Sequence, residues 1–405
     1  MKKLSITLVD RLLATLVIVF LIPVWIINLF MCCLSFTPLI QHISKIDALG
    51  RPIVVRHFSR GLFKNSAVLI DILVNKYSFC GVSMDYDPKQ KTSFSCDLPS
   101  GVFSLKELQS SVGLSDMNLR DSLRKHLANN SVAYHLGLIL RGALSRLLYR
   151  DAALQSPSRF RLLDVPIDNA TMTEAINWIV NCKTCKKPER ANFINVNSIN
   201  LAQDDVEFLA TLTSAGRCFA DGSGLRLGAR RLGVQLRDNV NGTDLLPFLC
   251  DRMAQTGQSL FLLGAAPGVA QETAKRLKSR YPSLCIAGCH HGFFSDSEND
   301  AVVSCIKSSK ADVCLVALGS PRQELWVQRF HEELGVSCTM GVGGLFDFYS
   351  GRMPRAPLWL REIGFEWLWR LKQEPVKKFR RYVIGNPVFL FHILFAKRRS
   401  HHAAI

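Results

Sequence analysis

The sequence predicts an α/β fold with a parallel, doubly wound sheet in the second half of the chain. Short apolar strands alternate there with helical segments of about ten residues, as in sheets whose strands are joined by crossover helices. A near-neutral middle also lies between two basic ends: residues 1–150, 151–351 and 352–405 carry net charges of +9, −1 and +9, which sum to +17. With 48% hydrophobic and 20% charged residues, the 405-residue chain can bury a core, which excludes a disordered protein.

The first element in the chain is an apolar stretch that predicts a membrane anchor. Leu12 to Ile40 contains 29 residues without Asp, Glu, Lys or Arg, and about 20 apolar residues span a bilayer core. Pro23 lies within it and removes a helical hydrogen bond, so the stretch is either one kinked span or a re-entrant hairpin. A membrane is therefore a better partner for the basic ends than nucleic acid.

Residues 45–150 form a mixed segment. Val68–Val74 is an apolar run, and Leu98–Leu114 has the Pro and Gly content of a loop. His135–Tyr149 is predicted as a basic amphipathic helix, which either lies on an anionic leaflet or packs on a core. The polar break at Gln155–Arg159 predicts a domain boundary, which separates an anchoring region, 1–155, from a core, 156–351, and a basic aromatic C-terminal segment, 352–405.

After this boundary the alternation of strands and helices begins. Thr171–Asn181 is a predicted helix that opens with Thr-x-x-Glu, a capping box. Further helices are expected over Ala270–Arg280 and from Pro321 through Phe330. Six strands are predicted: Asn192–Val196, Gly216–Ala220, Ser259–Leu263, Leu284–Gly288, Val313–Leu318 and Cys338–Val342. Ligands of such sheets bind beyond the carboxyl ends of the strands.

Three glycine-rich turns follow predicted strands, at Asp221–Gly224, Gly264–Gly268 and Gly341–Gly344. Glycine lets backbone amides approach a phosphate, so together they indicate a nucleotide or diphosphate site. The chain lacks G-x-x-x-x-G-K-[ST], which argues against a P-loop NTPase, and lacks the dinucleotide fingerprint of dehydrogenases. Its D-x-D motif, Asp85–Asp87, lies outside the predicted sheet, so no metal-bridged diphosphate site is indicated there.

Two polar positions at strand ends are candidate functional residues. Asp221 could take a proton from an incoming hydroxyl, or it could cap the following helix. Gln323 and Glu324 could hydrogen-bond a sugar or a base edge, or simply begin a helix. The thirteen cysteines include the C-x-x-C pair Cys182 and Cys185. Because no second ligand pair is spaced for zinc, reduced cytosolic thiols are the better interpretation.

A series of ordered motifs between about residues 160 and 395 resembles the WecG/TagA/CpsF family of glycosyltransferases (glycosyltransferase family 26). The motifs are Asn195-Val-Asn-Ser-Ile-Asn200, Ala220-Asp-Gly-Ser-Gly224, Asn241-Gly-Thr-Asp244, Phe261-Leu-Leu-Gly264, Gly319-Ser-Pro-Arg-Gln-Glu324, Gly341-Val-Gly-Gly-Leu-Phe-Asp347, Arg355-Ala-Pro357, Gly364-Phe-Glu-Trp-Leu-Trp-Arg370 and Glu374-Pro375. Two positions depart from the family pattern: Asn195 stands where several members carry Thr, and Asn239 where many carry Arg.

The resemblance implies a Rossmann-like core of GT-E type with a basic C-terminal helical appendage. It implies an inverting, metal-independent transfer from a UDP-sugar to a polyprenyl-diphosphate-linked saccharide, with no cofactor and with Asp221 as the base. The implied donor-binding residues are Asn195, Asn197, Gly222, Gly224, Asn241, Gly264, Gly319, Gln323 and Glu324. The appendage arginines that would bind the acceptor diphosphate are Arg355, Arg361, Arg370, Arg380 and Arg381.

Residues 8–150 resemble, more weakly, a bacterial polyprenyl-phosphate hexose-1-phosphate transferase. Ile22-Pro23 matches the proline break of its membrane helix. Its D-E-L-P-Q-L-x-N-V-L motif corresponds to Lys64-Asn-Ser-Ala-Val-Leu-Ile-Asp-Ile-Leu73, so Lys64 and Asn65 replace the catalytic Asp-Glu pair. Without those carboxylates neither the covalent intermediate nor the metal site should form. The resemblance implies a degenerate, inactive anchor.

The leading hypothesis is a transferase of exopolysaccharide, capsule or O-antigen assembly, at the inner membrane with its catalytic domain facing the cytoplasm. It would move a hexose or an N-acetylhexosamine. One alternative is a bifunctional enzyme with an active front domain, and another is a non-catalytic membrane scaffold. No nucleic-acid partner is expected, and homo-oligomer formation, the sugar and the linkage stay open.

Overall fold

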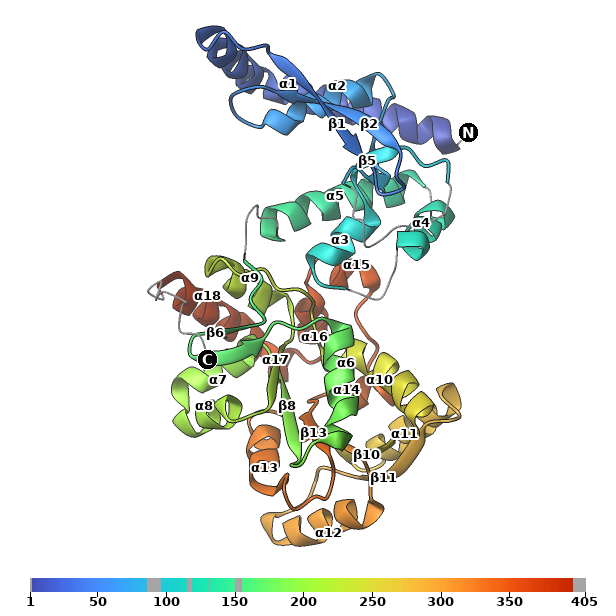
Figure 1. The fold of residues 1–405 in the computed structure, drawn as a ribbon, viewed down its shortest axis with the longest axis vertical. Helices are drawn as coiled ribbons and strands as arrows, with labels where there is room; N and C mark the ends of the chain where they lie inside the picture. Colours follow the sequence, from blue (N-terminus) through green and yellow to red (C-terminus); the bar gives the residue numbers. More distant parts are fainter. Residues whose placement is uncertain (1, 86–95, 115–118, 130, 150–154, 396–405) are drawn as a thin grey trace. The chain divides into compact units, whose positions relative to one another are not determined.

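The computed structural model describes residues 2–85, 96–114, 119–129, 131–149 and 155–395. The chain divides into two compact units, Met1–Arg150 and Asp151–Ile405, whose elements are labelled in Figure 1. The D-x-D motif runs past Asp85 into residues outside the described ranges. Each unit is considered by itself.

The first unit begins with one long helix, α1 (Lys2–Leu34). Pro23 lies inside this helix, and the chain does not reverse direction there. The structure therefore shows one continuous helix and not the re-entrant hairpin that was the other alternative. Within the described residues, Leu4–Leu34 is the one helix long and apolar enough to cross a membrane. Most of its large apolar side chains are exposed in the unit, as expected of a segment whose burial requires another partner.

In the described part of the first unit, two small sheets, four α-helices and a 3₁₀ turn follow α1. The hairpin β1 (Ile40–Ile46) and β2 (Pro52–Phe58) is antiparallel, while β3 (Ser78–Cys80), β5 (Ser100–Phe103) and β4 (Val82–Ser83) run parallel in that order. The helices are α2 (Val68–Leu73), α3 (Leu105–Ser111), α4 (Leu119–Ala128) and α5 (Val132–Tyr149). The loop expected over Leu98–Leu114 is wrong: it contains β5 and α3, because Ser104 caps α3 by accepting from the Glu107 N–H at 3.0 Å.

Polar side chains of α1 tie it to the rest of this unit. Asp10 accepts a hydrogen bond from Ser78 Oγ at 2.5 Å and faces His135 Nε2 at 2.6 Å. Near the other end, Asn28 bonds both the N–H and the carbonyl of Leu62. Buried charged and amide groups need such partners, so α1 is docked through specific contacts. The basic helix α5 buries His135 and Leu138, but Leu140 and Leu147 on it remain exposed.

The second unit is built on an eight-stranded sheet. Its strand order is β11-β10-β12-β13-β8-β9-β7-β6, with all neighbours parallel except the hairpin β6–β7. The parallel α/β core predicted from the alternation of strands and helices is therefore confirmed. The strands are β6 (Arg159–Leu162), β7 (Val165–Asp168), β8 (Glu189–Ile194), β9 (Arg217–Ala220), β10 (Ser259–Gly264), β11 (Cys285–His290), β12 (Val313–Ala317) and β13 (Cys338–Gly341).

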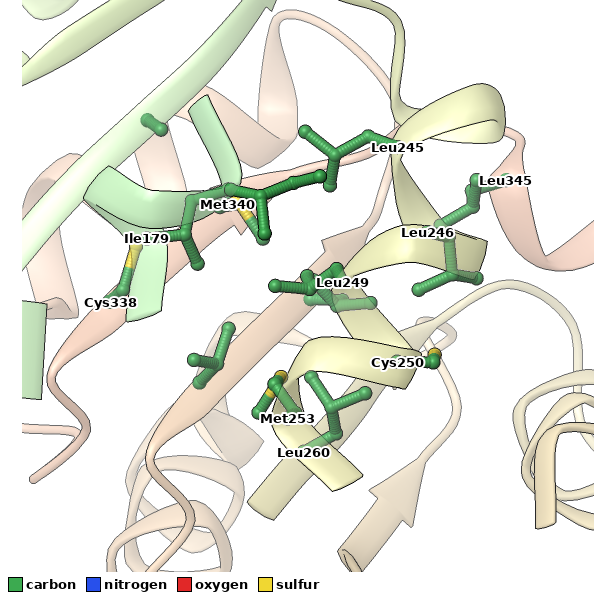
Figure 2. Packing of buried hydrophobic residues seen from close by; sticks show 14 of the residues in the cluster. Ile179, Leu245, Leu246, Leu249, Cys250, Met253, Leu260, Cys338, Met340 and Leu345 are labelled. Carbon is green, nitrogen blue, oxygen red and sulfur yellow. The ribbon is translucent and has the colours of Figure 1, made fainter. Parts of the chain in front are cut away.

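Helices cover both faces of this sheet because successive strand residues point to opposite sides. Leu260 and Leu262 of β10 join one apolar cluster, whereas Phe261 and Leu263 join another. The first face is covered by α6 (Met172–Asn181), α10 (Gly242–Thr256), α11 (Val269–Arg280) and α14 (Leu345–Tyr349). Figure 2 shows Leu245, Leu249 and Met253 of α10 in this cluster, with Met340 and Leu260 from the strands.

The opposite face is covered in two parts. One part contains α7 (Val196–Asp204), α8 (Val206–Thr213), α9 (Ser223–Arg231) and α18 (Gly385–Phe395), and the other contains α12 (Asn299–Ser309) and α13 (Arg322–Phe330). Phe389 and Ile393 of α18 are buried against this cluster. One side of α18, the last helix of the described chain, is thus part of the unit's core.

Between the sheet and α18 lies a series of short helices. They are α15 (Leu358–Arg361), α16 (Glu366–Gln373), α17 (Pro375–Phe379) and a π-helical turn over Arg380–Ile384. Hydrogen bonds join this segment to the core: Ser223 Oγ donates to the Gly364 carbonyl at 2.6 Å, and Asn200 Nδ2 donates to the Gly385 carbonyl at 2.8 Å. These contacts therefore lie at the start of α9 and the middle of α7.

Candidate active site

The carboxyl ends of the central strands bring the predicted polar residues together. Strand order changes direction between β13 and β8, because β8 continues toward β9 on one side while the later strands lie on the other. Such a switch point opens a crevice at the carboxyl ends of the strands. Asn195 follows β8, Asp221 follows β9, Gly319 comes two residues after β12, and Gly343 comes two residues after β13.

Asp221 lies on this edge in a partly buried position. Its N–H donates to the Ile194 carbonyl at 2.7 Å, which joins the end of β9 to the end of β8. Burial raises the pKa of the Asp221 carboxyl to about 6, and the nearby charge of Glu366 adds to the rise. Arg370, Arg381 and a hydrogen bond from Asn195 limit it. A carboxylate whose pKa lies near neutrality is suited to accept a proton.

The orientation of the Asn195 amide is fixed by the hydrogen bond with which Asn195 caps α7. Its Oδ1 accepts from the Ser198 N–H at 3.2 Å and caps α7 in a capping box. Because the oxygen is used in this way, the amino group is the part that can donate to Asp221. Asn195 is therefore both a cap and a hydrogen-bond donor to the candidate base.

A second cluster connects the turns after β12 and β13. Gln323 Oε1 accepts from the Gly343 N–H at 2.9 Å, and Gln323 Nε2 donates to Glu324 Oε1 at 2.9 Å. Ser320 Oγ donates to the same carboxylate oxygen at 2.6 Å. Both Gln323 and Glu324 are about 3% exposed. Both ends of the Gln323 amide are thus occupied by the protein, which fixes the glycine turn.

Glu324 keeps one oxygen free for another group. Its Oε2 is buried and has no hydrogen-bond partner among the described residues. Burial raises the pKa of this carboxyl, against the lowering effect of Ser320, Gln323 and Arg381. An unpaired buried polar atom costs free energy, so a ligand that supplies a hydroxyl or an N–H here would be favoured.

The predicted arginines fall into two groups around two carboxylates. Arg355 and Arg361 meet Asp244 Oδ1 at 2.5 and 2.8 Å. Arg370 and Arg381 are charges that act on Asp221, and Glu366 lies 3.6 Å from Arg370 and 3.8 Å from Arg355. Arg380 is exposed. The pKa of Asp244 is lowered: burial alone would raise it, but Arg355 and Arg361 outweigh that effect.

Comparison with known proteins identifies the second unit. The model of the family described as "Glycosyl transferase WecG/TagA/CpsF family" matches residues 160–403, more than half of the chain. The chain therefore belongs to the WecG/TagA/CpsF family of glycosyltransferases. Three Staphylococcus aureus proteins, from strains MW2, NCTC 8325 and COL, are each 32% identical to it over 244 residues. These residues are 59% of this chain and 93% of each relative. All three are named N-acetylglucosaminyldiphosphoundecaprenol N-acetyl-beta-D-mannosaminyltransferase.

In this WecG/TagA/CpsF glycosyltransferase, the other predicted glycines stand where a Cβ would collide or where φ is positive. Gly264 ends β10 with φ +132°, and a Cβ there would collide with the backbone of Ala317. A Cβ on Gly224 would collide with the Val196 side chain, so α9 and α7 begin close together. Asn197 lies in the first turn of α7, Asn241 caps α10, and Gly319 has φ +80°.

Sequence reasoning did not single out two carboxylates of this candidate site. Asp244 pairs with Arg355 and Arg361, which lie more than a hundred residues later in the chain. Glu366 pairs with Arg355, which lies about ten residues earlier. The signal was present, since Asp244 closes the Asn-Gly-Thr-Asp motif and Glu366 lies within Gly364–Arg370. All thirteen cysteines are free, and the described part of the chain contains no group of three or more His, Cys, Asp or Glu that could hold a metal ion.

Proposed function

We propose that the protein transfers a hexose or N-acetylhexosamine from a UDP-sugar to a polyprenyl-diphosphate-linked saccharide, with inversion at the anomeric carbon. The names of the Staphylococcus aureus relatives support an N-acetylated sugar and a lipid-linked acceptor. The observation that carries the proposal is the position of Asp221: it follows β9 at the carboxyl end of the sheet, next to β8 where the strand order changes direction, with a pKa raised to about 6 by burial and with Arg370 and Arg381 acting on its charge.

In this proposal Asp221 removes the proton from the acceptor hydroxyl. The hydroxyl oxygen forms a bond to the anomeric carbon while the bond from that carbon to the UDP phosphate oxygen breaks. The electron pair leaves with UDP, and the proton stays on the Asp221 carboxylate until the product departs. Asn195 orients the carboxylate through its amino group. A positioned base of this kind contributes roughly 10²–10⁴-fold to rate.

The donor diphosphate is proposed to bind at the glycine turns after β10, β12 and β13. α11 begins at Val269, and its N-cap residue, Gly268, makes no side-chain cap hydrogen bond; the Val269 N–H donates to the Ala266 carbonyl, and the following N–H groups lack a cap from Gly268. Free N–H groups at a helix start favour an anion. The unpaired Oε2 of Glu324 faces no protein donor in the described chain, which supports a contact with a sugar hydroxyl or a base N–H. Gln323 contributes by holding the Gly343 turn.

The acceptor diphosphate is proposed to bind at the arginines of residues 352–395. Arg355 Nε and Nη2 and Arg381 Nε are buried donors without a hydrogen-bond partner in the described residues. A dianionic diphosphate would satisfy these donors, and charge-assisted hydrogen bonds of this kind contribute about 1.5–3 kcal/mol each. Arg361 is the more buried of the two arginines on Asp244, with 13% of its side chain exposed against 25% for Arg355, so we assign it mainly to holding the site together.

The first unit is proposed to be an inactive relative of a phosphosugar transferase that anchors the enzyme at the inner membrane. Lys64 and Asn65 are exposed and begin a 3₁₀ turn, Lys64–Ala67. Neither side chain can supply the carboxylate that a covalent intermediate or a divalent cation would need. α1 provides the apolar segment, and we propose that the catalytic unit lies on the cytoplasmic side.

The proposal is tested by measuring UDP release. Full-length protein in detergent would be given a panel of UDP-sugars with a polyprenyl-diphosphate-linked monosaccharide. Asp221→Asn is the test variant, and Asp204→Asn, an exposed carboxylate at the end of α7, is the matched control. Acceptor-dependent release that is lost only in Asp221→Asn supports the transferase and its base. Equal release from wild type and Asp221→Asn contradicts the base assignment. UDP binding without release from any donor contradicts the proposed acceptor.

A further inference from the structure

The turn that follows Asp221 has an unusual backbone. Gly222 has φ +97° and ψ 157°, a conformation that residues with a Cβ rarely adopt. Its N–H donates to Asn239 Oδ1 at 2.6 Å, while the preceding N–H, of Asp221, donates to Ile194 at 2.7 Å. Two successive N–H groups beside the candidate base are therefore held by two different segments of the chain.

The loop that presents Asn239 is itself fixed on both sides. Arg237 donates to both carboxylate oxygens of Glu174, at 2.7 and 2.6 Å. Asp238 Oδ2 accepts from the Met172 N–H at 2.8 Å, at the start of α6. On the other side, the N–H of Asn241 donates to the Asn239 carbonyl at 3.0 Å, and Asn241 then caps α10. Asn239 thus extends from a loop anchored to α6 and α10, and its amide oxygen has a defined position.

Asn239 also performs a task that α9 does not perform for itself. Gly222 is the N-cap residue of α9 and has no side chain to accept from the helix N–H groups. The Asn239 side chain accepts from the N–H of this N-cap residue itself. In a capping box the side chain of the third helical residue would do this, but here that residue is Leu225. The peptide that carries this N–H includes the carbonyl of Asp221, so its orientation sets the direction in which the Asp221 side chain leaves the backbone.

We infer that Asn239 is a positioning residue for Asp221: it holds the Asp221–Gly222 peptide so that the carboxylate faces the acceptor hydroxyl. The inference rests on the proposed function, because it assigns Asn239 a role in that same reaction. A general base must lie within about 2.6–3.2 Å of the group it deprotonates, and a displacement of about 1 Å can cost about 10²-fold in rate. Gly222 is bonded directly to Asp221, so a shift of the Gly222 N–H would also shift the Asp221 carboxylate.

The test compares three variants of the full-length protein in the UDP-release assay. Asn239→Ala removes the acceptor, and we expect kcat to fall about 10- to 100-fold while KM for the UDP-sugar changes less than about 2-fold. Asn239→Asp keeps an acceptor for the Gly222 N–H. It should retain a kcat near wild type at high pH, but its negative charge should move the acidic limb of kcat/KM above pH 6. Asp204→Asn, the exposed control at the end of α7, should leave kcat unchanged.

The outcomes separate the two levels of the argument. Turnover that survives Asp221→Asn removes the base and, with it, this role of Asn239. An inactive Asp221→Asn together with a wild-type kcat in Asn239→Ala overturns only the Asn239 inference. A kcat loss in Asn239→Ala that is fully explained by the fraction of protein unfolded at the assay temperature, measured from its Tm, also overturns it, because the effect would then be loss of stability. If Asn239→Ala does not fold, Asn239→Asp decides: an unmoved acidic limb contradicts the inference.

Discussion

Gln323 holds the glycine turn after β13 by accepting a hydrogen bond from the Gly343 N–H at 2.9 Å. The same side chain lies against Gly341, where an added Cβ would come within 2.9 Å of Gln323 Nε2. The turn that we assign to donor binding is therefore shaped by a side chain from α13, the helix that joins β12 to β13. Gly341 has no Cβ because Gln323 occupies that space.

This packing predicts a coupling between the two residues. Gly341→Ala should lower the free energy of unfolding and weaken UDP binding, because the Gln323 amide must move and release the Gly343 N–H. Gln323→Ala should do the same by about 1–3 kcal/mol, since it leaves a buried donor unpaired. The double variant should cost less than the sum of the two single variants, because the shortened side chain at position 323 leaves room for the new Cβ. Thermal unfolding and UDP calorimetry measure both quantities, and strictly additive effects would contradict the contact.

The raised pKa of Asp221 predicts how activity depends on pH. As a base it must be ionised, so kcat/KM should rise with pH through a limb near pH 6. Asp221→Asn should remove that limb together with the activity. A limb that stays near pH 4 in wild type would show that Asp221 is not desolvated in the working enzyme.

The same shift predicts a pH dependence of stability with a definite sign. A pKa of about 6 in the folded protein, against an ordinary value of 3.8, means that the folded state binds more protons between these pH values. Stability from this group is present at low pH and is lost as pH rises from about 4 to about 6. The difference corresponds to roughly 3 kcal/mol, and solvent at the partly exposed carboxylate reduces it. The Tm of Asp221→Asn should therefore rise relative to wild type over this range, and a constant gap would refute the expectation.

Much of this sheet could be predicted from sequence because its strands are short apolar runs that end in glycine or polar residues. The predicted strand Ser259–Leu263 differs from β10 by one residue. The helix predicted over Thr171–Asn181 begins at Met172 with the expected capping box from Thr171 and Glu174. Local signals of this kind need only the neighbouring sequence. The end of a predicted strand was also enough to place Asp221 at the carboxyl edge of the sheet, whereas Asn195 was implied only by the family resemblance.

The hairpin β6–β7 carried no such signal. Its two turn residues, Leu163 and Asp164, both have positive φ, 48° and 65°, a combination that normally favours Asn and Gly. Antiparallel pairing from Arg159↔Asp168 to Leu162↔Val165 holds them there. The pairing of Arg361 with Asp244 also depends on tertiary packing, because it spans 117 positions of sequence. The sequence could therefore identify a basic segment, but not which of its arginines are already paired with a carboxylate.

The buried pairing of Asp244 predicts a large loss of stability when it is broken. Asp244→Asn leaves Arg355 and Arg361 near each other without their counter-charge, and losing one partner of a buried ion pair costs about 3–5 kcal/mol. Asp251→Asn changes an exposed carboxylate on the same helix α10 and should cost less than about 0.5 kcal/mol. Thermal unfolding and limited proteolysis within residues 352–395 provide the measurement. Equal melting of the two variants would show that the pairing does not hold this segment.

Arg380 and Arg381 are neighbours in the chain with different surroundings, and this difference gives the last prediction. Arg380 is exposed, whereas the charge of Arg381 acts on Asp221 and Glu324. Successive residues of a helical turn point in different directions, so we expect only Arg381 to reach the acceptor diphosphate. Arg381→Ala should raise the acceptor KM about 10- to 100-fold, as expected for the loss of about 1.5–3 kcal/mol of charge-assisted bonding. Arg380→Ala should change it less than about 3-fold.

A second readout separates lost contact from lost charge at this position. Because Arg381 lowers the pKa of Asp221, Arg381→Ala should move the acidic limb of kcat/KM above pH 6. Arg381→Lys should keep the limb in place, since the charge is retained, but should still weaken acceptor binding because a single ammonium cannot present two parallel donors to a phosphate. Titrating acceptor against each variant at several pH values gives both results. Equal effects of Arg380→Ala and Arg381→Ala would place the diphosphate elsewhere on the basic segment, because only a diffuse electrostatic attraction treats the two positions alike.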